Sequence, residues 1–211
     1  MKIHRKVFSP IQVNTYILED DSGKGAIIDC GCYDESEFNE LQKLLEAECI
    51  EPVLLLNTHM HLDHIFGNRF MLEKYGLKTH SSSGEEMNRV SSAEHAVLFG
   101  LSMEQPPETE GFLADGQIIS FGNINLDTIF VPGHTAGSVA FYHEISNSVF
   151  TGDALFAGSI GRTDLPGGDY DKLIKSIRSR LLILPDNTRV FPGHGPESTI
   201  GFEEANNPYL V

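Results

Sequence analysis

The sequence HMHLDH provides four metal-binding side chains, His59, His61, Asp63 and His64, directly after the apolar run at residues 53–56. If that run is an extended strand, the first two histidines project to the same side, because strand side chains alternate between the two faces. Asp63 and His64 are adjacent, so they reach the same volume only if the backbone turns there into a helix, which Asp63 would cap. The stretch therefore predicts a metal site at the carboxyl end of a strand.

Three later segments supply further candidate ligands in one repeated way. The sequences VPGH and FPGH end two predicted strands and present His134 and His194 through a Pro-Gly turn, and Asp153 follows Gly152 at the end of another strand. Glycine beside a ligand lets the backbone turn tightly and come close to a bound ion. We expect these three side chains to join the first cluster.

The complete ligand set is too large for one tetrahedral ion and suits two. Its members are His59, His61, Asp63, His64, His134, Asp153 and His194. Imidazole suits zinc and iron, and carboxylate adds affinity for manganese. We therefore expect two divalent ions, zinc first, with iron or manganese as alternatives. Their charge would outweigh that of two carboxylates and a bridging hydroxide, so the centre would attract a polarised carbonyl or an anion without a serine or cysteine nucleophile.

The charge balance restricts the partners. Among 211 residues there are 15 Lys and Arg against 30 Asp and Glu, a net charge of -15, which argues against nucleic acid or an anionic membrane. No segment approaches the roughly 18 apolar residues of a membrane span, and no signal-peptide core follows the basic start. We expect a cytoplasmic protein that binds a small molecule. The three cysteines form no disulfide framework, and Cys30 and Cys32 are either buried thiols or a redox pair.

The order of the predicted elements indicates a single domain made of two similar halves, residues 1–107 and 108–211, joined by a Pro-rich acidic linker. In the first half we expect strands at 3–8, 15–18, 25–28 and 53–56, a helix capped by Asp34, and a helix after the ligands. The polar stretch 81–105 would be a helix and loop lining the substrate entrance. In the second half we expect strands at 117–121, 124–131, 138–142, 149–151 and 188–191, and a helix capped by Asp169. Two packed sheets covered by helices follow.

The pattern HxHxDH, followed by His134, Asp153 and His194, resembles the metallo-β-lactamase superfamily over essentially the whole chain. The resemblance implies an α/β fold, the αββα sandwich of two mixed β-sheets flanked by helices. It also implies the ligand sets, which are His59, His61 and His134 for one ion, Asp63, His64 and His194 for the other, and Asp153 as the bridge. The segments TGD at 151–153, GRTDLPGGD at 161–169 and PGHG at 192–195 are most similar to glyoxalase II-like hydrolases of the short type without a C-terminal helical domain.

This resemblance implies a dinuclear metal-dependent hydrolase, similar to hydroxyacylglutathione hydrolase, in which a metal-bridging hydroxide attacks a thioester such as an S-2-hydroxyacyl thiol. Asp63 and Asp153 would be its catalytic residues. β-Lactamases with two zinc ions usually lack an Asp at the position of Asp153, which argues against antibiotic hydrolysis. Two alternatives stay open. One is a mononuclear iron persulfide dioxygenase, with an Arg in a similar Gly-Arg-Thr-Asp stretch, and the other is a lactonase.

The substrate is expected to be an acidic thioester, and Arg162 is the candidate for binding its acid group. The other interpretation of Arg162 is an ion pair with Asp164 or Asp169. Tyr170 would either donate a hydrogen bond near the reacting oxygen or pack against its neighbours. The thiol carrier stays open, because the helical domain that holds glutathione in full-length glyoxalase II has no counterpart in this sequence.

Overall fold

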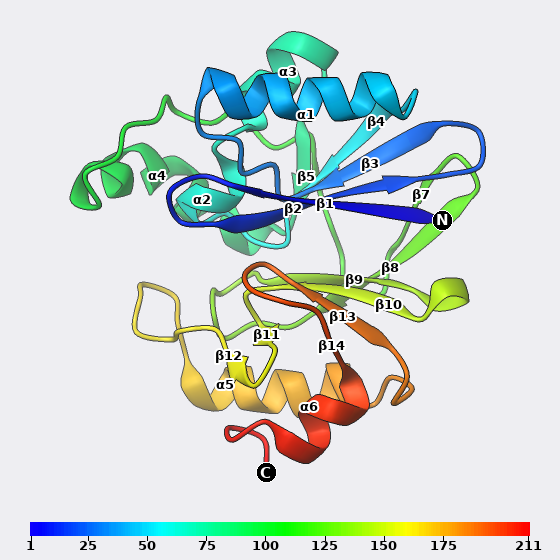
Figure 1. The fold of residues 1–211 in the computed structure, drawn as a ribbon. Helices are drawn as coiled ribbons and strands as arrows, with labels where there is room; N and C mark the ends of the chain where they lie inside the picture. Colours follow the sequence, from blue (N-terminus) through cyan, green and yellow to red (C-terminus); the bar gives the residue numbers. More distant parts are fainter.

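The central strands are buried on both faces, which requires a covering layer on each side of every sheet. β2 (Val13–Glu19) is buried at six successive residues, and β9 (Val139–His143) and β10 (Ser148–Gly152) are buried throughout. The computed structural model, which describes residues 1–211, meets this requirement with four layers, helix, sheet, sheet and helix (Figure 1). The predicted αββα sandwich is therefore confirmed.

The first sheet joins an antiparallel part to a parallel part. β1 (Lys2–Phe8), β2 and β3 (Lys24–Ile28) pair antiparallel, and β4 (Glu51–Leu56), β5 (Thr79–Ser81) and β6 (Gly111–Phe112) extend the sheet from β3 in parallel. Because β3 and β4 are parallel, both strands end at the same edge of the sheet. The chain that follows each of them, Asp29 and the HMHLDH segment, therefore starts from that edge.

The second sheet repeats this arrangement with different connections. Its strand order is β14-β13-β10-β9-β8-β7. Four of these strands, β7 (Ile118–Phe121), β8 (Ile124–Phe130), β9 and β10, form an antiparallel meander. β13 (Arg189–Pro192) lies parallel to β10, and the short β14 (Ser198–Thr199) closes the edge. The parallel pair places the segments with Asp153 and His194 side by side. A small ribbon of β11 (Leu155–Phe156) and β12 (Ser159–Ile160) follows Asp153.

Helices cover the outer face of each sheet (Figure 1). On the first sheet lie α1 (Glu35–Ala47) and α3 (Asn68–Tyr75), and on the second lie α5 (Tyr170–Ser176), its π-helical continuation Ile177–Leu181, and α6 (Ile200–Asn206). Asp34 and Asp169 cap α1 and α5 as expected. α2 (Leu62–Ile65) and α4 (Glu86–Leu98) lie together at one end of the sandwich. None of these helices combines the length and the apolar composition needed to span a lipid bilayer.

Aromatic side chains pack between the two sheets and hold one against the other. The ring of Tyr16, on β2, packs edge-on against Phe150 and Phe191 of the second sheet, at centroid distances of 5.2 and 5.6 Å. Its buried hydroxyl donates a hydrogen bond to the carbonyl of Pro192 at 2.7 Å. Aromatic pairs of this geometry add to the energy of burial. The strand that delivers His194 is therefore held directly by the first sheet.

Several local predictions were wrong or incomplete. The single helix expected after the ligands is split into α2 and α3 at Gly67, where an added methyl group would lie 2.4 Å from the sulfur of Cys30. Asp63 lies inside α2, and the N-cap is His61. The strands β5, β6, β11, β12 and β14 were not predicted, because two or three residues carry no readable alternation. The helix α6 was also missed. Cys30 and Cys32 are both free and fully buried, as in the first of the two interpretations.

Candidate metal centre

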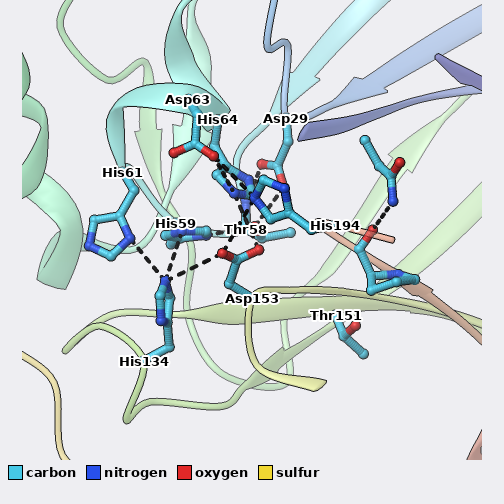
Figure 2. A network of polar contacts seen from close by, with 12 residues as sticks. Asp29, Thr58, His59, His61, Asp63, His64, His134, Thr151, Asp153 and His194 are labelled. Carbon is cyan, nitrogen blue, oxygen red and sulfur yellow. Dashed lines mark hydrogen bonds and ion pairs between the residues drawn. The ribbon is translucent and has the colours of Figure 1, made fainter. Parts of the chain in front are cut away.

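The predicted ligands converge at one end of the sandwich, although they leave four different strands (Figure 2). The segment after β4 carries His59, His61, Asp63 and His64, the segment after β8 carries His134, the turn after β10 carries Asp153, and the turn after β13 carries His194. Each of these strands runs toward the same edge of its sheet. Seven side chains that are far apart in the sequence therefore face one small volume.

The first group consists of His59, His61 and His134, whose ring nitrogens point at one another (Figure 2). Nε2 of His134 lies 3.2 Å from Nε2 of His59 and 2.9 Å from Nδ1 of His61. Nitrogens bound to one tetrahedral zinc, each about 2.0–2.1 Å from it, lie roughly 3.3 Å apart. The spacing of this three-histidine cluster thus fits a single divalent ion.

The second group consists of Asp63, His64 and His194. Oδ2 of Asp63 lies 3.1 Å from Nε2 of His194 and 3.6 Å from Nε2 of His64. Asp153 stands between the two groups, because its Oδ1 lies 3.3 Å from Nε2 of His64 and its Oδ2 lies 3.7 Å from Nε2 of His134. One carboxylate therefore reaches both the three-histidine cluster and this aspartate-histidine cluster.

Two atoms at this junction show that the donor set fits a cation. Nε2 of His64 and Oδ1 of Asp153 are buried and have no hydrogen-bond partner within the protein. Buried polar atoms are almost always satisfied, since an unpaired one costs free energy. A divalent ion coordinated by both atoms would satisfy them, and imidazole together with carboxylate is a common ligand combination for such ions.

The outer ring nitrogens are held by protein groups. Nδ1 of His134 donates to the carbonyl of Arg162 at 2.7 Å, and Nδ1 of His194 donates to the carbonyl of Gln12 at 3.1 Å. A carbonyl only accepts, so the proton of each ring lies on Nδ1 and the lone pair of Nε2 points inward. Such outer partners set the tautomer and the orientation of histidines that bind metal ions.

Asp29 orients the aspartate-histidine cluster, and the sequence analysis missed it. It is 2% exposed, and its Oδ2 contacts Nδ1 of His64 at 2.9 Å. The same carboxylate accepts hydrogen bonds from the backbone N–H of Thr58 at 2.8 Å and from its hydroxyl at 2.7 Å. An aspartate directly after the buried strand β3 was a signal that could have identified it. Asp29 therefore fixes both His64 and the chain next to His59.

Glu85 has the corresponding role for the three-histidine cluster. Its fully buried carboxylate accepts from the N–H of Met60 at 2.8 Å, between His59 and His61. It also accepts from the hydroxyl of Thr135 at 2.6 Å and from the N–H of Gly137 at 2.9 Å. Glu85 thereby joins the loop of His59 and His61 to the loop of His134. No pattern in the sequence marks this residue.

Two glycines allow the close approach that the sequence predicted. A methyl group on Gly193 would lie 2.2 Å from Oδ1 of Asp153. Gly152 has a φ of +50°, and a methyl group there would lie 2.2 Å from the hydroxyl of Thr58. Side chains at either position would push ligand-bearing segments apart. The turns that present Asp153 and His194 therefore require glycine.

Comparison with known families agrees with this geometry. The sequence profile of the metallo-beta-lactamase superfamily matches residues 9–194, which include all seven candidate ligands. The chain belongs to the metallo-beta-lactamase superfamily. Members of this fold bind divalent metal ions, and the two clusters are the candidate metal site of this chain.

Individual members of the superfamily resemble the chain over its whole length. Hydroxyacylglutathione hydrolase GloC of Haemophilus influenzae is 38% identical over 206 residues, covering 94% of this chain and 93% of its own. The crystal structure of the BLEG-1 B3 metallo-beta-lactamase has a TM-score of 0.91 at 31% identity and covers 100% of both chains. TTHA1623 in a di-iron-bound form has a TM-score of 0.89 at 36% identity and covers 98% of this chain and 100% of its own.

Two members of the three-histidine cluster, His59 and His61, resist protonation. Burial and the neighbouring imidazoles of His64 and His134 hold the pKa of His59 well below its ordinary value. Burial, together with His134, lowers the pKa of His61 to about 3. Both rings are therefore neutral near physiological pH, which is the form that binds a metal ion.

The aspartate-histidine cluster has the opposite electrostatics. Burial by itself lowers the pKa of His64, but the carboxylates of Asp153, Asp63 and Asp29 outweigh it and raise that pKa well above its ordinary value. The pKa of His194 is also raised, because the hydrogen bond to Asp63 and the charge of Asp153 exceed the effect of burial. Burial raises the pKa of Asp63 and Asp153, yet the histidine charges reverse this and lower it.

A cavity of about 580 Å³ opens beside the ligands. Its wall includes Arg162 and several residues of α4, among them His95. Arg162 donates two hydrogen bonds of 2.7 Å to Asp164, one of the two ion pairs considered for it. Tyr170 does not line this cavity, and it is half-exposed at the start of α5.

Proposed function

We propose that this protein is a metal-dependent thioester hydrolase with two divalent ions, most naturally zinc, and an S-2-hydroxyacyl thiol as substrate. The observation that carries the proposal is the position of Asp153 between two clusters, each of which offers ligands for one ion. The similarity to GloC, named as a hydroxyacylglutathione hydrolase, supports the thioester. The bridging position of Asp153 favours two ions over one.

In this proposal the three-histidine cluster holds the first ion, the aspartate-histidine cluster holds the second, and Asp153 binds both. When bound, such ions polarise a carbonyl group and acidify water, which lets water attack near neutral pH. The reaction adds water to the thioester carbonyl, breaks the carbon–sulfur bond and releases a thiol and a carboxylic acid. A thiol of ordinary pKa, about 8.5, leaves without needing a strong acid beside it.

Asp63 and Asp153 are the proposed catalytic side chains. Their lowered pKa values keep both carboxylates ionised near neutral pH, so neither is suited to store a proton. They act instead as fixed negative groups that bind the cations and orient the attacking water by accepting its hydrogen bond.

Arg162 is proposed to bind a polar or acidic group of the substrate by exchanging its hydrogen bonds with Asp164. A guanidinium binds a carboxylate through two parallel bonds, which lysine cannot reproduce. Arg162→Lys should therefore raise KM for S-lactoylglutathione and leave the melting temperature nearly unchanged, because the ion pair with Asp164 is exposed. Tyr170 is proposed only as a residue that contacts substrate after movement of its exposed ring.

A cytoplasmic location is part of this proposal. All three cysteines, Cys30, Cys32 and Cys49, are free thiols in the structure. Free thiols persist in the reducing conditions of the cytoplasm, whereas disulfides are typical of oxidising compartments. The acidic net charge of -15 agrees with a small-molecule enzyme that has no nucleic acid partner.

The decisive experiment separates hydrolysis from oxygenation. Zinc-loaded and iron-loaded protein are incubated separately with S-lactoylglutathione and with glutathione persulfide, and free thiol and oxygen uptake are followed in each. Thiol release from the thioester without oxygen uptake is the expected result. Iron-dependent oxygen uptake with the persulfide, and no thioester turnover, would identify a persulfide dioxygenase instead. Turnover of a lactone, without turnover of the thioester, would support metal-dependent hydrolysis and refute the thioester as the substrate.

A further inference from the structure

The cavity beside the metal centre has a mainly apolar wall built from separate elements. Its hydrophobic lining residues are Ile11, Leu62, Leu98, Phe99, Phe156 and Leu165. Leu98 and Phe99 end α4, Leu62 begins α2, and Phe156 lies on the ribbon after Asp153. A substrate whose carbonyl reaches the two clusters therefore has apolar side chains around its remaining atoms.

Two polar side chains that α4 contributes to this wall, Asn88 and Ser92, are already engaged within the protein. The hydroxyl of Ser92 donates to the carbonyl of Arg89 at 2.8 Å, and the amide of Asn88 donates to Glu85 at 2.9 Å. Arg162 is the single Lys or Arg in the lining, and both of its bonds go to Asp164. The α4 side of the cavity thus offers a carboxylate no lysine or arginine, and His95 is its one titratable side chain.

The end of α4 instead presents large apolar side chains to water. Leu98 is 80% exposed and Phe99 is 56% exposed, although both line the cavity. Ile11, in the loop after β1, is 38% exposed at the same cavity. Exposed apolar surface of this kind beside a binding site gains free energy when a ligand covers it. We call Ile11, Leu98 and Phe99 the apolar rim.

We propose that the apolar rim binds an uncharged aliphatic or aromatic chain of the substrate. This inference rests on the proposed thioester hydrolysis and specifies its substrate class. Glutathione carries two carboxylates and an ammonium group, for which the rim has no partners. The natural substrate is therefore a thioester with an apolar chain on its acyl group or on its thiol. The polar or acidic group proposed to bind Arg162 is a different part of the same molecule.

Two substrate series distinguish the acyl chain from the thiol chain. In the first series, zinc-loaded protein hydrolyses acetyl, butyryl and hexanoyl thioesters of N-acetylcysteamine. In the second, the acyl group is acetyl throughout, and the thiol is N-acetylcysteamine, butanethiol or benzyl mercaptan. We expect kcat/KM to rise roughly two- to fourfold for each methylene group that reaches the rim, in one of the two series. The series that shows the rise identifies the position of the chain.

Variants then test whether the apolar rim causes the preference. Leu98→Ala and Phe99→Ala should flatten the dependence of kcat/KM on chain length, with the largest loss for the longest chain. Val97→Ala is the matched control, because Val97 is 70% exposed on the same helix and does not line the cavity. All three positions are exposed, so the melting temperature should stay constant and show that each variant is folded.

The outcomes separate this inference from the proposed function. Equal kcat/KM along both series would refute the binding of an apolar chain by the rim and leave thioester hydrolysis standing. A preference of every variant for S-lactoylglutathione would have the same meaning. No turnover of any thioester overturns the proposed function. In that case, calorimetric binding of butyrate, hexanoate and octanoate to the zinc-loaded protein still tests the rim. Carboxylate affinity that rises with chain length, and rises less in Phe99→Ala, supports the role of the rim. Affinity that is independent of chain length refutes that role.

Discussion

The three-histidine cluster and the aspartate-histidine cluster lie within one site but present opposite environments to a cation. His59, His61 and His134 offer only nitrogen ligands, and burial keeps the first two neutral. The other cluster mixes imidazole with carboxylate, and its carboxylates favour protonated histidines when no metal ion competes. The difference teaches that the surrounding residues give two adjacent candidate metal positions different protonation behaviour.

The supporting carboxylates follow the same division. Asp29 bonds to the ring of His64 itself, whereas Glu85 bonds to backbone groups beside the histidines and to Thr135. The aspartate-histidine cluster is therefore oriented through a side-chain contact, and the three-histidine cluster through the loops that carry it. Such outer contacts affect metal affinity almost as directly as the ligands do.

The largest effect is expected from Asp153, which the two clusters share. Asp153→Ala should lower kcat/KM by about a thousandfold and reduce the metal content to one ion or less, because the variant removes the group that holds both positions together. Elemental analysis and thioester turnover measure the two effects. Asp171→Ala, an exposed change in α5, is the control. Two retained ions at full activity would show that the clusters do not depend on this carboxylate.

A smaller effect should separate the clusters from each other. Asp29→Asn should weaken metal binding at the aspartate-histidine cluster, and Glu85→Gln at the three-histidine cluster, each by roughly ten- to a hundredfold. Glu85 accepts four hydrogen bonds, so either orientation of a glutamine places its NH2 group against a backbone N–H. Titration of the metal-free variants with zinc against a chromophoric chelator measures both affinities.

The spectrum of cobalt-substituted protein shows which position stays filled, since an all-nitrogen ligand set absorbs differently from one with carboxylates. Glu94→Gln is the control for Glu85→Gln, because Glu94 lies exposed on α4, the helix that begins directly after Glu85. If both variants lose the same ion first, Asp29 and Glu85 do not serve separate clusters, and the comparison fails.

The smallest effect is a difference in pH dependence. The raised pKa values of His64 and His194 mean that an ion entering the aspartate-histidine cluster must displace protons, so its affinity falls as pH falls through those values. The lowered pKa values of His59 and His61 keep these two rings free of protons until the pH is far lower. Between about pH 8 and pH 5, the affinity of the second ion should fall about tenfold per pH unit for each proton displaced.

Metal content after dialysis at successive pH values tests this difference. We expect two ions at high pH and one at the acid end, with the remaining ion in an all-nitrogen site. Loss of both ions at the same pH would mean that the protein does not distinguish the two positions by their protonation.

The convergence of the candidate ligands was predictable because their signals are local. HMHLDH lies within six residues, and the Pro-Gly-His turns repeat the same short pattern, so neither depends on knowing distant contacts. The caps Asp34 and Asp169 were predictable for the same reason. The division of the chain into two halves near residue 107 stays a prediction, as does the role of each ligand.

The supporting residues were not predictable, because their contacts are distant in the sequence. Asp29 meets Thr58 and His64, and Glu85 meets Met60 on one side and Thr135 on the other, across separations of 25 and 50 residues. Only the packed sheets bring these pairs together. Arg162 illustrates the converse, since its partner Asp164 lies two residues away and was among the predicted alternatives.

The anchoring of the His194 turn has a consequence for how the enzyme is made. Asn14 donates from its side chain to the carbonyl of Pro192 at 2.9 Å and from its backbone to that of Gly193 at 2.7 Å, which joins the second strand to one of the last. During synthesis on a ribosome, these partners emerge far apart in time, and contacts of such long sequence separation slow folding. His59, His61 and His134 leave the ribosome before His194, so the proposed three-histidine position can be completed before the proposed second position.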